Sequence, residues 1–190
     1  MAKDLLYRDA PVSVDEMWWL AKQGRLFISS DADQNDVVTG QTSFADTTPT
    51  FLLDVPRSVT AVPLFLNLSQ TGTVAGGDIQ IITEIDKIKR YSTGGTAEKV
   101  FTPSKIGTPS CRFYSGATAL AGYGIRLMGV TTGADVSPAE GAIQGPFWPP
   151  EMPYLLEGPA TFLVYIYAAT TGPTVFWSFG WAELETRSEL

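Results

Sequence analysis

The run Thr174–Glu185 restricts the fold of this chain most, because apolar and polar residues alternate along it with a period of two. The apolar side holds Val175, Trp177, Phe179 and Trp181. Small or polar residues occupy the other side, where Phe176 interrupts them. Successive side chains of a strand point to opposite faces, so the run predicts a strand with one buried face. We therefore expect Trp177 and Trp181 to lie in the core.

Other short runs rich in β-branched and aromatic residues follow Gly24, and turns of Gly, Pro, Asp, Ser and Thr separate them. The predicted strands are Arg25–Ser29, Val37–Ser43, Thr50–Val55, Val59–Leu68, Asp78–Arg90, Glu98–Phe101, Cys111–Ser115, Tyr123–Val130, Thr161–Ala168 and Thr174–Glu185. Many short strands with turn signals between them predict two packed sheets. A helix is the competing interpretation for Asp78–Arg90, although its β-branched residues favour a strand. Pro63 predicts an edge or a bulge, because proline cannot donate to a β-ladder.

A short helix is predicted ahead of the strands. Ser13-Val-Asp-Glu16 has the spacing of a capping box, and Gly24 suits the position just beyond a helix end. We expect a helix over residues 14–23 in an N-terminal segment 1–24. Residues 25–190 are expected to form one β-sandwich domain.

Charge and composition exclude several function classes. The net charge is −7, so the phosphate backbone of a nucleic acid repels the chain, and we expect no direct nucleic-acid partner. Lys87, Lys89 and Arg90 form a basic cluster that we interpret as a solvated strand end. No apolar run is long enough to span a membrane, and the first residues lack a signal-peptide pattern. These features predict synthesis in a host cytoplasm.

Catalytic chemistry has little support in the sequence. Histidine is absent and Cys111 is the single cysteine, which removes the commonest bases, nucleophile pairs and zinc ligands. We expect Cys111 to be a small buried residue, and we predict no catalytic residue, cofactor or bound metal. Asp31–Asp36 resembles the start of a calcium loop but lacks its glycine and final glutamate, so a turn is the better interpretation. A carboxylate pair could still serve a glycosidase, and the candidate carboxylates are Glu84, Asp86, Glu140, Glu151 and Glu157.

Aromatic residues outside the predicted core indicate an interaction surface. Trp18 and Trp19 are adjacent on the predicted helix, about 100° apart, so one helix face cannot bury both fully. The stiff apolar segment Phe147-Trp148-Pro149-Pro150 lies in the long irregular stretch Thr131–Pro153. We predict that this segment and the helix meet another subunit. The alternatives are that they cover edges of their own sandwich, or that exposed aromatic rings stack on sugars.

The chain resembles viral single jelly-roll proteins, above all bacteriophage capsid or decoration subunits. The likeness lies in a leading helix, eight to ten strands, Gly/Pro/Thr-rich loops and the aromatic strand Val175-Phe-Trp-Ser-Phe-Gly-Trp181. The resemblance implies a self-associating virion structural protein without an active site, with copies of itself (a homotrimer) and other capsid proteins as partners. We therefore predict an all-β, jelly-roll-like two-sheet β-sandwich with one short N-terminal helix. A carbohydrate-binding module or receptor-binding tip is the alternative function, and a carboxylate-based glycoside-processing enzyme is the third.

Overall fold

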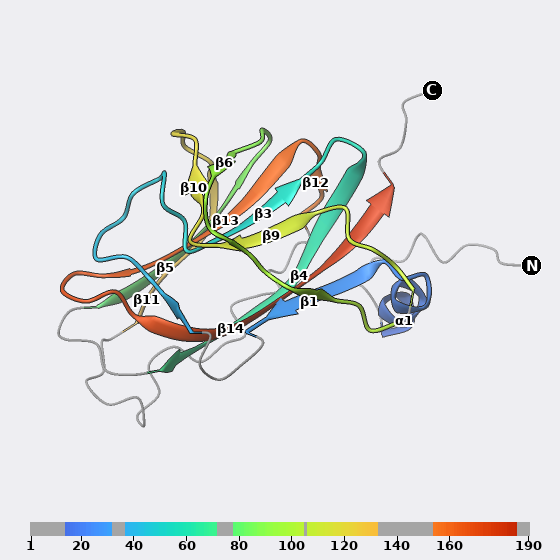
Figure 1. The fold of residues 1–190 in the computed structure, drawn as a ribbon, viewed down its shortest axis with the longest axis horizontal. Coiled ribbons are helices and arrows are strands. Elements are labelled where there is room, and N and C mark those ends of the chain that lie inside the picture. Colours follow the sequence, from blue (N-terminus) through green and yellow to red (C-terminus); the bar gives the residue numbers. More distant parts are fainter. Residues whose placement is uncertain (1–13, 32–36, 72–77, 105, 133–153, 186–190) are drawn as a thin grey trace, which may run out of the picture.

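The computed structural model of the chain describes residues 14–31, 37–71, 78–104, 106–132 and 154–185, and Figure 1 shows their arrangement. Most of the described strands form two antiparallel sheets that pack face to face. The front sheet has the spatial order β12 (Leu156–Glu157), β4 (Val59–Thr71), β14 (Thr174–Glu185), β1 (Leu26–Ser30) and β8 (Val100–Phe101), and β2 (Val38–Thr39) also pairs with β14. The back sheet has the order β11 (Ile125–Thr132), β5 (Ile79–Asp86), β13 (Ala160–Ala168), β3 (Phe51–Val55), β9 (Arg112–Ser115) and β7 (Thr96–Ala97). A small ribbon pairs β6 (Tyr91–Thr93) with β10 (Thr118–Ala119).

The strand pairs have the connectivity of a jelly roll. Eight strands carry this connectivity: in chain order they are β1, β3, β4, β5, β11, β12, β13 and β14. The first pairs with the eighth, the second with the seventh, the third with the sixth and the fourth with the fifth. These antiparallel pairs are β1–β14, β3–β13, β4–β12 and β5–β11. Two interleaved Greek keys give this arrangement. The predicted all-β fold, a jelly-roll-like two-sheet sandwich with one short helix, is therefore confirmed.

The core between the sheets is aromatic. Val175, Trp177, Phe179 and Trp181 are all buried, so the predicted inward face of β14 is confirmed. The Phe113 ring lies between the sheets, 5.2 Å from the Trp177 ring and 5.0 Å from the Phe179 ring. Offset contacts of this kind add to the free energy gained from burying apolar area. The predicted core positions of Trp177 and Trp181 are confirmed.

One predicted strand is divided between the sheets. Only Val38–Thr39 of the predicted run Val37–Ser43 pairs with β14, while Gln41 bridges to Tyr167 of the back sheet. Gly40 marks the crossing, because a Cβ atom there would lie 2.4 Å from the Ile166 carbonyl oxygen. The prediction of a continuous strand over Val37–Ser43 is thus wrong, since the chain passes from one sheet to the other.

The remaining elements follow the predictions closely. Helix α1 (Val14–Lys22) occupies the predicted position, and β5 is a strand and not a helix. The pairing of β4 with β14 shifts between Gly180–Phe65 and Trp181–Pro63, so the predicted bulge beside Pro63 is confirmed. The short strands β6, β7, β10 and β12 were not predicted. Ser13, the predicted helix cap, lies outside the described residues.

Candidate functional site

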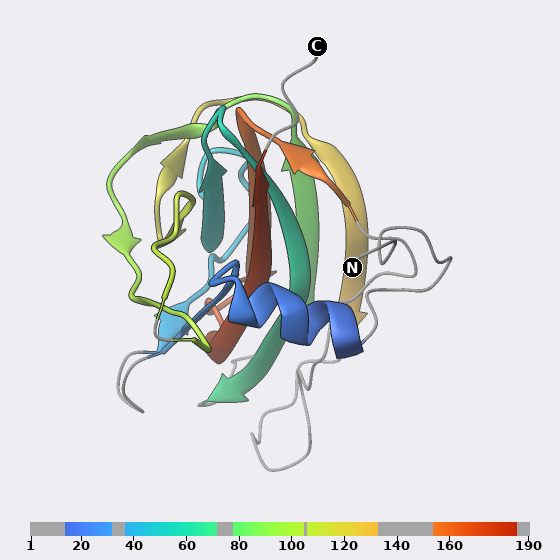
Figure 2. The same ribbon diagram turned by 90° about the vertical axis from the view of Figure 1, so that its right-hand side faces the viewer.

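Helix α1 lies across the outer face of the front sheet, as Figure 2 shows. Leu20 of the helix packs with Leu26 of β1, Val62 of β4 and Ala182 of β14. Met17 and Ala21 extend this contact on the helix side. The helix is therefore held by its apolar face, and its opposite face remains available to solvent.

The solvent-facing side of α1 carries the two predicted interface tryptophans. Trp18 is 60% exposed and Trp19 is 49% exposed. The Lys22 amino group lies 3.4 Å from the centre of the Trp18 ring, which gives that ring a cation–π contact. Ile106, which is 59% exposed, lies beside the end of the helix, where a Cβ on Gly24 would meet the Ile106 carbonyl oxygen at 2.4 Å. We call the surface of Trp18, Trp19 and Ile106 the α1 surface.

In the part of the chain that the structure describes, the outer face of the front sheet also contains a groove of about 470 Å³. The lining residues that define the front groove are Ser30, Asp31, Asn67, Ser69, Phe176 and Ser178. Strand register places Ser30, Ser178 and Asn67 in one row across β1, β14 and β4. The next row holds Phe176 opposite Ser69. The Asn67 side-chain amide donates to the Ser178 hydroxyl at 3.2 Å, so two polar groups of the row are oriented by each other.

Sequence analysis did not identify the front groove as a site. Phe176 gave the available signal, because it is a large aromatic residue on the polar side of the β14 alternation. Its partners come from strands more than 100 positions away in the chain. A pattern read along one strand cannot reveal such neighbours.

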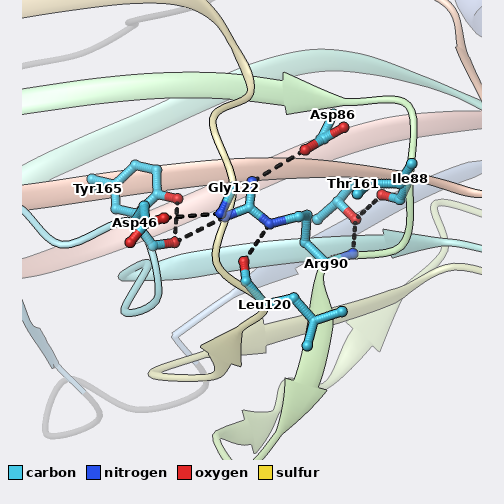
Figure 3. A network of polar contacts seen from close by, with 8 residues as sticks. All are labelled: Asp46, Asp86, Ile88, Arg90, Leu120, Gly122, Thr161 and Tyr165. Atoms are coloured by element: carbon cyan, nitrogen blue, oxygen red, sulfur yellow. Dashed lines mark hydrogen bonds and ion pairs between the residues drawn. The ribbon is translucent and has the colours of Figure 1, made fainter.

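The outer face of the back sheet is closed by a polar network around Arg90, drawn in Figure 3. The Arg90 side chain is fully buried. Its guanidinium donates to the Leu120 carbonyl at 2.5 Å, to Asp86 Oδ2 at 3.1 Å and to the Asp46 carbonyl at 3.2 Å. The Arg90 backbone N–H donates to the Thr161 hydroxyl at 2.9 Å. The predicted solvated position of Arg90 is therefore wrong, whereas its neighbours Lys87 and Lys89 are exposed.

The segments that meet Arg90 cover the back sheet. We call residues 41–49 and 116–122, together with β6, the back cover. Asp46 belongs to the back cover. Its backbone carbonyl also accepts a hydrogen bond from the Tyr165 hydroxyl at 2.9 Å. Its side-chain carboxylate accepts one from the Gly122 N–H at 2.9 Å. Apolar contacts add to the network, since the Phe44 ring lies 4.9 Å from the Tyr165 ring. Burial, and then the nearby charge of Glu84, raises the pKa of Tyr165.

The buried carboxylate of Glu183 joins the two sheets at one end of the sandwich. Glu183 of β14 accepts from the backbone N–H groups of Ser110 at 2.8 Å and Cys111 at 3.0 Å. It also accepts from the Trp181 indole N–H at 3.0 Å. Cys111 is buried as predicted, and burial followed by the charge of Glu183 raises the pKa of its thiol well above the ordinary value. This cysteine is therefore a packing residue and not a reactive thiol.

The candidate carboxylates that the structure describes lie at two places, Glu84 and Asp86 on β5 and Glu157 on β12. Glu84 is buried beside Arg126, with 3.5 Å between the charged groups, and Asp86 pairs with Arg90. Glu157 is exposed on β12. Glu140 and Glu151 lie outside the described residues. Glu84 and Asp86 thus serve ion pairs at the back sheet.

Several predicted features fall where the structure gives no description. Phe147, Trp148, Pro149 and Pro150 of the predicted interface lie outside the described residues, as do residues 32–36 of the calcium-like turn. Among the residues that are described, no group of three or more His, Cys, Asp or Glu side chains could hold a metal ion. No helix in the same part of the chain has the length and apolar character needed to cross a membrane.

Comparison with known proteins adds no relative. Neither a protein-family model, nor a curated protein, nor a solved structure matches this chain.

Proposed function

We propose that this chain is a non-catalytic structural subunit of a virion shell, a capsid or decoration protein that associates with its own copies through the α1 surface. The observation that carries the proposal is the pair of exposed tryptophans, Trp18 and Trp19, on a helix whose other face is anchored to the sheet. A tryptophan held on a rigid element loses little conformational entropy when a partner covers it, and tryptophan is enriched at the energetic centres of protein interfaces.

Composition and fold support the same function. Charged residues make up only 17% of the chain, and the centres of protein interfaces are depleted in charge. Jelly rolls occur in viral capsid domains and also in lectins. The charged side chains that are buried in the described residues, Glu84, Arg90 and Glu183, all have partners within the fold. Their contacts stabilise the fold, which agrees with a non-catalytic role.

A second copy of the chain is the partner that we propose for the α1 surface, with closed three-fold symmetry as the expected assembly. Each copy carries a net charge of −7, so copies repel one another at long range. Salt screens this repulsion and leaves an apolar contact intact. Association through Trp18 and Trp19 should therefore strengthen as salt is added, whereas a contact made of ion pairs would weaken.

Light scattering after size exclusion tests the proposal. The wild type should show about three times the 20.5 kDa mass of one chain at high concentration, and the trimer should persist to lower concentrations in high salt. The double variant Trp18→Ser/Trp19→Ser should have the mass of one chain. Tyr123→Ser is the matched control, because Tyr123 is an aromatic residue that is 93% exposed on a different part of the molecule. A wild type that stays monomeric at every concentration, or a double variant with the wild-type mass, would contradict the proposal.

A further inference from the structure

We propose that the front groove binds a neutral saccharide. The groove presents the Phe176 ring and several hydrogen-bonding groups on one face of the front sheet, whose strands have a fixed register. Phe176 is partly exposed and lines the groove, and Ser69 lies directly opposite it on β4. The row Ser30–Ser178–Asn67 runs beside this ring, across three neighbouring strands. A binding surface built on strands is well defined, because register and not loop conformation sets its spacing.

The polar groups of the groove suit sugar hydroxyls. A serine hydroxyl both donates and accepts, and the Asn67 amide offers two donors and one acceptor. Sugar hydroxyls likewise both donate and accept, so either partner can adjust to the other. The Phe176 ring offers an apolar face with a negative quadrupole, on which the C–H groups of a pyranose ring can stack. An apolar surface with a few convergent polar groups is typical of small-ligand sites, and about 470 Å³ is within their usual range.

Other ligand classes fit the groove less well. Among the described lining residues the charged one is the acid Asp31, and the chain carries a charge of −7, so phosphate and acidic sugars are repelled. An extended peptide usually binds by adding a strand to a sheet edge. The groove instead lies over the face of the sheet, where Ser30, Ser178 and Asn67 of the paired strands β1, β14 and β4 form one row. Recognition there must use side chains, which favours a ligand rich in hydroxyl groups.

The groove and helix α1 lie at different positions along β14. Helix α1 contacts β14 at Ala182, whereas the groove involves Ser178 and Phe176 of the same strand. Four to six strand residues separate these positions, a distance of roughly 13–20 Å. The saccharide proposal therefore does not depend on self-association, and each can fail without the other.

A glycan array with neutral and acidic oligosaccharides, followed by calorimetry with the best neutral hit, tests the proposal. We expect the wild type to bind a neutral oligosaccharide and Phe176→Ala to weaken that binding at least tenfold. Phe176→Tyr, which keeps an aromatic ring, should retain binding within a few fold. Tyr123→Ala is the control, because it removes an exposed ring that lies just before β11 of the back sheet and not on the front sheet.

Asn67→Leu provides a second variant that does not alter the core, since Asn67 is exposed. This variant should also weaken binding of the neutral oligosaccharide at least tenfold. Thermal unfolding of each variant would show whether that variant is folded. The proposal is overturned if the wild type binds no neutral glycan on the array or binds acidic glycans alone. Equal affinities of the wild type, Phe176→Ala and Asn67→Leu for the hit would overturn it as well.

Discussion

The two outer faces of the sandwich are covered in different ways. On the front sheet, α1 is held by apolar contacts such as Leu20 against Leu26 and Val62, and the described residues leave a groove beside it. On the back sheet, the back cover surrounds the fully buried Arg90. A buried charge is costly unless every donor is satisfied, so the back cover must close completely around it. An apolar contact has no such requirement, and the front face can therefore leave tryptophans and a groove exposed.

Replacing Arg90 should have the largest effect on stability. Arg90→Met removes the partner of Asp86 and leaves the Leu120 carbonyl without this donor. Breaking a buried ion pair in this way costs about 3–5 kcal/mol. Urea denaturation monitored by tryptophan fluorescence would measure the change, with the exposed Lys87→Met expected to stay within about 0.5 kcal/mol of wild type. Equal stabilities of the two variants would show that the network does not hold the back cover.

Truncating the helix anchor should cost less. Leu20→Ala removes the buried side chain that joins α1 to the front sheet, and we expect a loss of about 2–3 kcal/mol. Hydrogen exchange should also become faster in α1 while the back sheet keeps its protection, because the helix can detach locally. If Leu20→Ala destabilises the chain as much as Arg90→Met, the contrast between the two faces does not hold.

Removing the Tyr165 hydroxyl should have a smaller effect that depends on pH. Tyr165→Phe deletes one hydrogen bond to the Asp46 carbonyl, which still accepts from Arg90, so we expect a loss of about 1 kcal/mol at pH 7. The raised pKa keeps folded Tyr165 protonated, whereas the unfolded tyrosine ionises near pH 10. The unfolded state therefore binds fewer protons above about pH 10, and wild-type stability should fall there as pH rises. Denaturation at pH 9 and pH 11 should show a smaller fall for Tyr165→Phe than for Tyr123→Phe.

Substitution on the α1 surface should change the stability of a single chain least. Trp18 and Trp19 are largely exposed, so Trp18→Ser/Trp19→Ser should alter the free energy of unfolding by about 0.5 kcal/mol or less per position. Denaturation should be measured at a dilution where the wild type is monomeric, since association would add to its apparent stability. A loss of several kcal/mol at that dilution would mean that the tryptophans stabilise the subunit itself, and not a contact between copies.

Sequence patterns predicted the long elements well because their signals are local. The bounds of β14 agree with the predicted run Thr174–Glu185, and its alternation identified the buried face. Strands of two residues, such as β7 and β12, have no periodicity to detect. Their pairing depends on which long strand lies beside them in the fold.

The tertiary environment of single residues was harder to predict. Arg90 follows two exposed lysines, and nothing near it in the sequence indicates that residues 41–49 and 116–122 will cover it. The front groove could not be predicted for the same reason, because Ser30, Asn67 and Phe176 come from three separate strands. Trp18 and Trp19 could be identified as candidates because adjacent helical positions cannot both face the sheet.

Hydroxyl-radical footprinting of the wild type at low and high protein concentration tests most directly whether the α1 surface is a contact between copies. We expect oxidation of Trp18 and Trp19 to fall several-fold at high concentration, while Tyr123 is labelled equally at both concentrations. Unchanged labelling of Trp18 and Trp19 across the concentration range, or equal protection of Tyr123, would contradict it.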